Sequence, residues 1–289
     1  MEKLLFQGKI PDLSVEQILR DGSFNMTRQH FHSSYEIYYL LEGERNYFIK
    51  SKAYRVGRGN LVFIGCGQIH KTTVAHSDRH ERILLEVSES LIHRLVQDPE
   101  GETLGHGPFS SRSGVLELTG TEQEWVEAAL FRMIEEIREK QPAYVQAATA
   151  VLQQLLIFIM RKDRSAESKS PAIHSAKHQK VNEVANYIGM NYSDIPSLDA
   201  LSERFYISKY YLCRIFKEVT GMTISQYINA NRLKAAEKML LESSESIIRI
   251  AALSGFGNVT YFDKVFRESL GLSPAQYRKF NRNLSGQQF

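Results

Sequence analysis

Between residues 30 and 87 the hydrophobic positions fall in short runs of four to six residues. The runs read EIYYLL, NYFI, AYRV, LVFI, KTTV and RILLEV, and turn-forming segments such as EGER, GRGN and GCGQ separate them. Short apolar or alternating runs at this spacing are typical of the strands of a small barrel or jelly roll. The pattern therefore predicts a β domain in this part of the chain.

After residue 88 the hydrophobic period becomes helical. Thr121 and Glu124 have the spacing of a capping box, which predicts a helix from there to Lys140. Pro142 ends that helix, and a second one follows. The apolar positions are Val126, Ala129, Leu130, Met133, Ile134 and Ile137 in the first helix and Ala148, Leu152, Leu155, Leu156 and Ile159 in the second. Such faces would either cover the barrel core or pair with a second subunit, and the pattern is the same for both.

Residues 161–180 are polar and rich in Ser and Lys, as linkers are, and everything after them has a helical pattern. We therefore predict an N-terminal domain at residues 1–162, a linker at 163–177 and a C-terminal domain at 178–289.

The C-terminal domain repeats itself at an offset of fifty residues. YYLCRIFKEVTGMTISQYI (210–228) aligns with TYFDKVFRESLGLSPAQYR (260–278). The pattern of each copy predicts a short helix, a tight turn and a second helix that stops at a glycine. The turn ends on a capping residue, which is Ser208 in the first copy and Asn258 in the second. Two helices joined in this way form a helix-turn-helix, and the chain uses the unit twice.

The second helix of each copy has a core face and an outward face. Core spacing selects Leu212, Ile215, Phe216 and Val219 in the first copy and Phe262, Val265, Phe266 and Leu270 in the second. The outward residues are Lys209, Tyr210, Cys213, Arg214 and Lys217, and Thr260, Tyr261, Asp263, Lys264 and Arg267. Side chains of these types can reach base edges and phosphates in a major groove. They would also suit an ordinary solvated face, but two copies in register weaken that alternative.

The helix predicted between the copies, Ile224 to Leu241, is about 27 Å long. Two recognition helices held that far apart can enter successive major grooves, which are roughly 34 Å apart on one face of B-DNA.

The run ALSGFGNVTYFDKVFRESLGLSPAQYRK resembles the signature of AraC/XylS-type transcription regulators, and LSERFYISKYYLCRIFKEVTG in the first copy also fits it. The resemblance implies a monomeric module with two DNA-binding motifs. In that family the bases are read from positions that correspond here to Tyr210, Cys213 and Arg214, and to Thr260, Tyr261 and Lys264. The full set of candidate DNA-binding residues is Ser208, Lys209, Tyr210, Cys213, Arg214, Lys217, Asn258, Thr260, Tyr261, Lys264 and Arg267.

The β domain resembles cupins. His30-x-His32-xxx-Glu36, followed after six residues by Gly43, is similar to the first cupin motif. The segment from Gly59 to His70 is similar to the second, with Gly65 where proline is usual. Regulators of the family typically carry such a barrel for effector binding and dimerisation. The implied fold is a two-domain α+β protein, with an N-terminal cupin-like β-barrel with appended helices and a C-terminal all-α tandem helix-turn-helix.

The barrel motif supplies a candidate site. Even spacing places His30, His32 and Glu36 on one face of a strand, and His70 would complete a set of three nitrogens and one carboxylate. Such a set suits iron, manganese, nickel or zinc. We rank an effector pocket or rim without metal first, a structural divalent metal second and a catalytic metal third; no other cofactor is indicated. Tyr38 and Tyr47 are further pocket candidates, and stacking aromatic rings would suit a carbohydrate.

Charge and composition agree with this picture. The net charge of +3 divides into +5 for residues 174–289, from 15 Lys and Arg and 10 Asp and Glu, and −2 for the rest. A mildly basic tail favours a polyanionic partner. The start lacks a basic leader followed by an apolar run, and the longest apolar run is Leu155–Met160, so we expect a cytoplasmic protein.

We therefore predict a sequence-specific DNA-binding transcription regulator, not an enzyme, that responds to a small-molecule effector. Its expected partners are double-stranded DNA, the effector, RNA polymerase and a second copy of the chain. The alternatives are a metal-dependent cupin enzyme fused to a DNA-binding module and a ligand-independent activator controlled by its abundance. The identity of the effector, the operator and the sign of regulation are not encoded in any motif that the sequence displays.

Overall fold

The computed structural model describes residues 1–22, 34–75, 78–96, 114–165, 175–195 and 197–285. At 163–165 and 281–285 it describes the backbone alone. These residues form two compact units, one on each side of residues 166–174. Helix α3 continues to Ser165 and α4 begins at Ala176, so the predicted linker 163–177 overlaps the ends of both. The predicted domain boundaries themselves stay a prediction.

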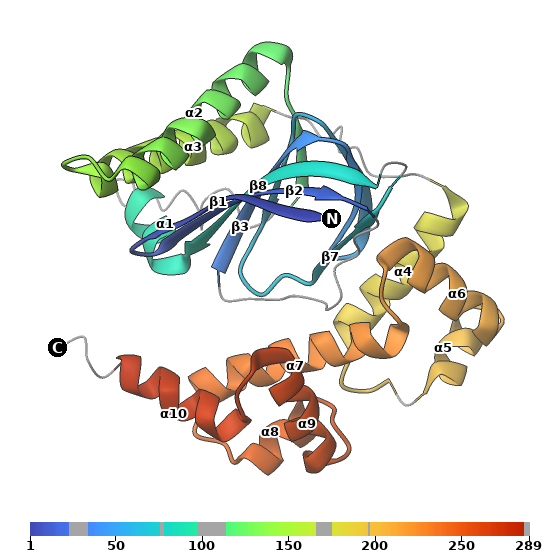
Figure 1. Ribbon diagram of the computed structural model, residues 1–289. Coiled ribbons are helices and arrows are strands. Elements are labelled where there is room, and N and C mark those ends of the chain that lie inside the picture. The colour runs from blue at the N-terminus through green and yellow to red at the C-terminus, as the bar shows by residue number, and fades with distance from the viewer. Residues whose placement is uncertain (23–33, 76–77, 97–113, 166–174, 196, 286–289) are drawn as a thin grey trace. The chain divides into compact units, whose positions relative to one another are not determined.

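In the described part of the N-terminal unit, nine strands form two antiparallel sheets that face each other as a barrel (Figure 1). One sheet has six strands in the order β1-β2-β8-β3-β6-β9, and the other has the order β5-β4-β7. The strands are β1 (Glu2–Ile10), β2 (Leu13–Asp21), β3 (Ser34–Glu42), β4 (Glu44–Ile49), β5 (Lys52–Gly57), β6 (Asn60–Ile64), β7 (His70–Val74), β8 (Arg79–Ser88) and β9 (Gly114–Glu117).

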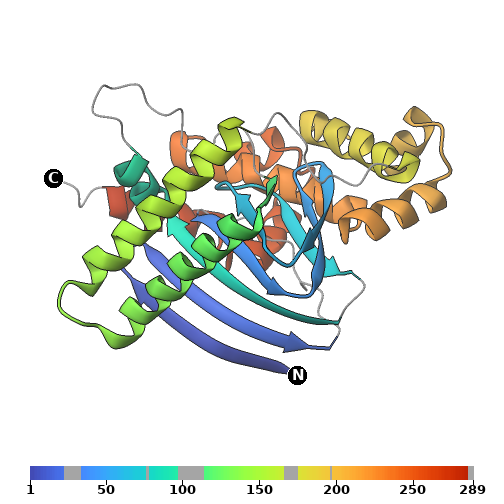
Figure 2. The same cartoon turned by 90° about the horizontal axis from the view of Figure 1, so that it is seen from above.

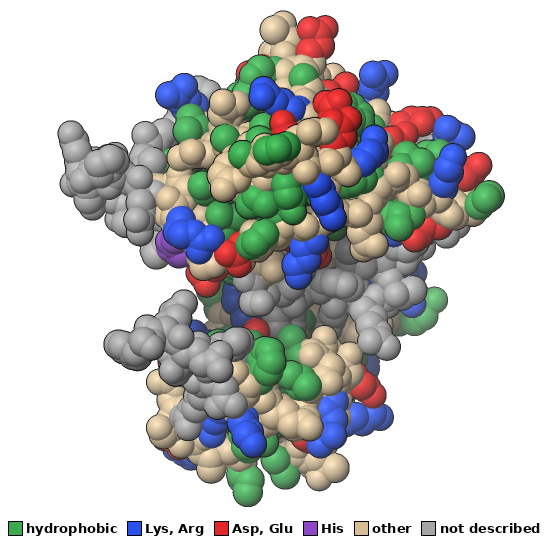
Figure 3. Space-filling view, turned by 60° about the vertical axis from the view of Figure 1, so that its left-hand side comes forward, with side chains coloured by type: hydrophobic (Ala, Val, Ile, Leu, Met, Phe, Trp, Pro, Cys, Tyr) green, Lys and Arg blue, Asp and Glu red, His purple; other side chains and the backbone are tan. Residues whose placement is uncertain are grey.

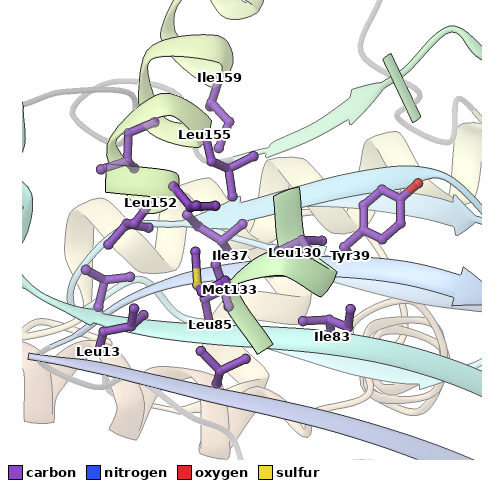
Figure 4. Close-up of a cluster of buried hydrophobic side chains, with 14 of the residues drawn as sticks. Leu13, Ile37, Tyr39, Ile83, Leu85, Leu130, Met133, Leu152, Leu155 and Ile159 are labelled. Carbon is purple, nitrogen blue, oxygen red and sulfur yellow. The ribbon is translucent and has the colours of Figure 1, made fainter. Parts of the chain in front are cut away.

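Within the residues that the structure describes, this unit has three helices: α1 (Glu89–Val96), α2 (Gly120–Glu139) and α3 (Tyr144–Ser165). Helices α2 and α3 lie side by side against the outer face of the six-stranded sheet (Figures 1 and 2). A hydrophobic core lies between these helices and the sheet (Figure 4). It contains Leu13, Ile37, Tyr39, Ile83 and Leu85 from the strands and Leu130, Met133, Leu152, Leu155 and Ile159 from the helices. The apolar faces of the two helices therefore cover the sheet.

Residues Tyr144–Lys162 of α3 are long and apolar enough to cross a membrane, judged by length and composition alone. The same segment contributes Ala148, Leu152 and Leu155 to the core against the sheet, each fully buried. Core helices of globular proteins can combine such length and hydropathy, so this one helix is weak evidence for a membrane span.

The start of α2 differs from the predicted one. Its N-cap is Thr119, whose hydroxyl accepts a hydrogen bond from the Glu122 backbone, while the Glu122 carboxylate accepts one from the Thr119 backbone. The prediction of Thr121 and Glu124 was wrong by two residues, because the chain contains two overlapping Thr-x-x-Glu pairs. Glu122 also contacts Lys162 of α3 at 2.7 Å, a tertiary contact that favours the earlier start.

The C-terminal unit consists of helices in its described part. They are α4 (Ala176–Asn191), α5 (Leu198–Arg204), α6 (Lys209–Thr220), α7 (Ile224–Glu242), α8 (Ile247–Leu253), α9 (Val259–Leu270) and α10 (Pro274–Ser285). The long helix α7 joins two three-helix groups, α4 to α6 at one end and α8 to α10 at the other (Figure 1). The predicted pair of helix-turn-helix units with a long helix between them is confirmed.

Candidate nucleic-acid interface and barrel interior

The second helix of each repeat, α6 or α9, starts and stops where the sequence indicates. Ser208 caps α6 by accepting from the Tyr211 amide, and Asn258 caps α9 by accepting from the Thr260 and Tyr261 amides. Both helices end at a glycine in the left-handed region, Gly221 or Gly271. The caps therefore fix the lengths of both candidate recognition helices.

The side chains predicted to face outward do so. Tyr210 is 80% exposed and Tyr261 48% exposed, whereas Phe216 and Phe262 on the opposite faces are fully buried. Also exposed are Ser208, Lys209, Arg214, Lys217, Asn258, Thr260, Lys264 and Arg267, and Cys213 is half-buried. These two faces could meet base edges and phosphates.

Several of these side chains have partners on the protein. Lys209 contacts Asp199 at 2.9 Å, Arg267 contacts Asp263 at 2.7 Å, and the Arg214 guanidinium lies 5.2 Å from the Tyr211 ring centroid. Exposed ion pairs contribute little stability, so a phosphate can compete for either cation. On the face shown in Figure 3, Lys and Arg side chains are spread among acidic and uncharged ones rather than gathered in one patch.

The two helix-turn-helix motifs are linked by contacts between the turn before α9 and the segment after α4. Gly255 has a φ of +88°, and a Cβ there would lie 2.6 Å from Ser193 Cα, in the segment after α4. Arg232 of α7 donates to the carbonyls of Tyr192, at 2.8 Å, and Ile195, at 3.3 Å, and lies 5.9 Å from the Phe256 ring. These contacts hold the α4–α6 group against the turn before α9.

The barrel interior follows from strand alternation. In β3, Glu36, Tyr38 and Leu40 face inward, whereas the alternate residues pack against α2 and α3. The inward apolar cluster comprises Tyr38, Leu40, Tyr47, Ile49, Tyr54, Val56, Val62, Ile64 and Val115. Both predicted pocket aromatics belong to it: the rings of Tyr38 and Tyr47 meet edge to face at 5.1 Å. Burial raises the pKa of Tyr38 to about 12, so its hydroxyl is a protonated donor near neutral pH.

Two members of the candidate metal set lie together in the barrel. Glu36 Oε2 is 3.4 Å from His70 Nε2, and both side chains are buried. His30 and His32 lie outside the described residues. Within the described residues no group of three or more His, Cys, Asp or Glu could hold a metal ion. Glu36 and His70 suit one as ligands, but they supply only half of the predicted set, so a bound metal stays a prediction.

The structure adds basic residues to the interior that the sequence reading missed. Arg45 is fully buried and donates to Thr72 Oγ1 at 3.2 Å, and Arg82 is 8% exposed and contacts Glu16 at 2.5 Å. Burial, and then the nearby Arg45, Arg20 and Arg82, lower the pKa of His80 to about 3. The signal was present, since Arg45 is two residues from Tyr47, and His80 and Arg82 alternate with the buried apolar residues of β8.

A tandem helix-turn-helix unit joined to an antiparallel barrel defines a regulator with one domain for DNA and one for a ligand. The profile of the AraC-like ligand binding domain matches residues 17–156, and that of a helix-turn-helix domain matches residues 201–279. The chain belongs to the AraC family of DNA-binding transcription regulators, and the relatives that match most of its length are named transcriptional activators.

Two curated relatives match most of the chain, and a third matches less than half of it. The HTH-type transcriptional activator RhaR of Pectobacterium atrosepticum is 27% identical over 86% of this chain and 85% of its own. The HTH-type transcriptional activator RhaS of Escherichia fergusonii is 23% identical over 95% and 94%. The regulatory protein PocR of Salmonella typhimurium is 31% identical, over 44% of this chain and 43% of its own.

Proposed function

We propose that the protein reads two successive major-groove segments of an operator through α6 and α9, while its barrel binds the small-molecule effector. The observation that carries the proposal is the pair of capped helices whose outward faces are exposed and whose inner faces are buried. Helix α7, with 19 residues, is about 28 Å long, which is close to one turn of B-DNA.

Individual roles follow from side-chain chemistry. Arg214 can donate two hydrogen bonds to one guanine, the strongest common base contact. Lys264 occupies the corresponding region of α9 but carries a single ammonium group, so it discriminates less. Cys213 and Thr260 are short and suit apolar or single hydrogen-bond contacts, such as those to a thymine methyl group.

Operator selection from a random DNA library tests these roles. Arg214→Ala should relax the base preference in one half-site and Lys264→Ala in the other, each by about 1–3 kcal/mol at the affected base pair. Lys238→Ala is the matched control, since Lys238 is an exposed cation on α7 that lies outside both recognition helices. If Lys238→Ala relaxes the same base pairs as the other two, α6 and α9 are not the reading elements.

We further propose that two copies pair through the outer surface of α2 and α3. Trp125, Phe131 and Ile157 are between 38% and 43% exposed there, although the inner faces of both helices are buried. Exposed aromatic residues of this kind are enriched at interfaces between subunits. Sedimentation analysis should show a dimer that Phe131→Asp converts to a monomer, whereas Glu135→Gln nearby leaves it intact. A monomeric wild-type protein would refute this part of the proposal.

The barrel site is proposed to bind the effector without a metal, with a structural divalent metal as the second candidate. Elemental analysis of the purified protein, compared with a His30→Ala/His32→Ala variant, separates these two. Stoichiometric metal in the wild-type protein that is lost in the variant would favour the metal.

The protein is proposed to act in the cytoplasm and to activate transcription through RNA polymerase, as the names of its relatives as activators suggest. Effector binding would change how the two units are held across the linker, and thereby which half-sites are occupied together. Transcription in vitro with purified polymerase, with and without effector, tests this directly.

A further inference from the structure

The interior of the barrel is polarised along its axis. Glu36 pairs across the sheet with Glu86, and Leu40, four residues further along β3, pairs with Arg82, so about 13 Å of strand separates the two levels. Strand β4 has the same order, because Ile49 pairs with His70 and Arg45 lies four residues away. The Glu36–His70 pair therefore marks one level of the interior, and arginines mark the other.

Guanidinium groups dominate the second level. Arg45 and Arg82 are both more than nine-tenths buried, and the Arg20 side chain is 13% exposed. The carboxylates that contact Arg82 and Arg20, Glu16 and Glu2, are more exposed than their partners, at 28% and 53%. Buried cations are costly unless an anion compensates them, and these carboxylates sit toward solvent.

Two hydrogen-bond donors in this region have no acceptor in the part of the chain that the structure describes. They are the Tyr38 hydroxyl and Nη1 of Arg82, both buried atoms. The Arg82 guanidinium carbon also lies 5.9 Å from the centre of the Tyr38 ring, so the two donors belong to one neighbourhood. Native proteins rarely leave buried donors unsatisfied, and such atoms require an explanation.

We propose that the effector is a small hydroxylated carboxylate, namely a sugar acid, whose carboxylate accepts hydrogen bonds from Arg82 and the Tyr38 hydroxyl. This inference deepens the proposed effector role of the barrel and rests on it. Arginine presents a planar pair of donors that matches a carboxylate, and charge-assisted hydrogen bonds are the strong ones.

The remainder of the interior suits the rest of such a ligand. The edge-to-face rings of Tyr38 and Tyr47 lie between the two levels and offer surfaces to the apolar faces of a sugar ring. The Glu36 carboxylate and the His70 imidazole at the other level can bind hydroxyl groups, which donate and accept. A neutral sugar would leave the donors of Tyr38 and Arg82 without an anionic acceptor.

Isothermal titration of the full-length protein tests the proposal with matched pairs. D-galacturonate and D-galactose differ by a carboxylate in place of a hydroxymethyl group, and D-glucuronate and D-glucose do so as well. At least one acid should bind more than tenfold more tightly than its neutral partner. Glucose 6-phosphate is included, because a phosphate could also satisfy the arginines.

Variants locate the carboxylate. Tyr38→Phe removes only the hydroxyl and should weaken binding of the acid about fivefold, and Arg82→Gln should weaken it tenfold or more. Arg79→Gln is the control, since Arg79 lies three residues away on β8 but is exposed and paired with Glu42. Binding of the neutral sugar should change less than twofold in Tyr38→Phe.

Three results would overturn the inference: equal or tighter binding of the neutral sugars, tight binding of the sugar phosphate alone, or no binding of either acid. The last result would leave ordered water as the acceptor for the Tyr38 hydroxyl and for Nη1 of Arg82. Operator binding is measured separately by gel shift without ligand. Its failure would count against the proposed function, whereas failure of the titration alone would count only against the sugar acid.

Discussion

Replacing Gly255 with alanine should destabilise the C-terminal unit more than either of two comparable substitutions. The change has two separable costs. An alanine at a φ of +88° is strained, at about 1 kcal/mol, and its Cβ would lie 2.6 Å from Ser193 Cα and 2.7 Å from Ser193 O. Because both neighbours are backbone atoms, relief requires the turn and the segment after α4 to move apart, at about 2 kcal/mol more.

Two other glycines of the same unit isolate these costs. Gly271 has a φ of +76° with nothing within 4 Å of an added Cβ, so Gly271→Ala carries the conformational cost alone. Gly257 has open space and no positive φ, so Gly257→Ala should lie within about 0.5 kcal/mol of the wild type. The expected losses are therefore about 3, 1 and 0 kcal/mol for positions 255, 271 and 257.

Urea denaturation of the full chain can measure these losses. Trp125, the single tryptophan, lies in α2, so its fluorescence follows the N-terminal unit and should be unchanged in all three variants. Circular dichroism at 222 nm also reports the C-terminal helices. With a slope of about 2 kcal/mol per molar urea, the midpoints for Gly255→Ala and Gly271→Ala should fall by about 1.5 M and 0.5 M.

Equal shifts for Gly255→Ala and Gly271→Ala would refute the reasoning. They would mean that the turn before α9 is not packed against the segment after α4, and that the two motifs are less firmly joined than the contacts of Arg232 indicate.

Further predictions concern binding, capping and pH. Arg214→Ala should weaken operator-specific retardation in a gel-shift titration by about 1–3 kcal/mol without lowering the urea midpoint, because the side chain is exposed. Unchanged specificity would contradict the assignment of Arg214. Thr119→Ala should lower the free energy of unfolding of the N-terminal unit by about 1 kcal/mol, whereas Thr121→Ala should leave it almost unchanged, as measured by Trp125 fluorescence in urea. The reverse order would show that Thr121 caps the helix. Because the pKa of His80 falls from 6.5 to about 3 on folding, the unfolded chain binds the proton first and the N-terminal unit loses stability as pH falls below 6.5. That loss should reach about 1–2 kcal/mol at pH 5 and shrink in His80→Gln; an identical pH profile for the variant would exclude His80 as its source.

The sequence predicted the C-terminal unit better than the N-terminal one, for a physical reason. Helix ends there depend on local chemistry, such as the hydroxyl of Ser208 and the glycine at 221, which a single sequence displays. Strands β1 and β2 were missed, although Leu13 and Val15 alternate. They form a local hairpin with each other, but that hairpin joins the sheet through the pairing of β2 with β8, some seventy residues away.

The candidate site shows the same division. The histidines and Glu36 were proposed from a motif, and Tyr38 and Tyr47 from composition, and their roles stay a prediction. Arg45 and Arg82 were not found, because charged residues in a strand are expected to face solvent. Their spacing from Tyr47 and from the buried residues of β8 was a signal, and the pairing of β4 with β7 and of β8 with β3 then shows that both face the interior.

The joint around Arg232 has a consequence for the nucleic acid. If the Arg232 contacts hold α6 and α9 at a fixed separation, the two helices cannot adjust to the spacing of the grooves. Helix α7 between them is about 28 Å long and B-DNA repeats at roughly 34 Å, so we expect the duplex to bend when both helices enter it. Operators with easily deformed pyrimidine–purine steps between the two half-sites should therefore be favoured at base pairs that no side chain touches.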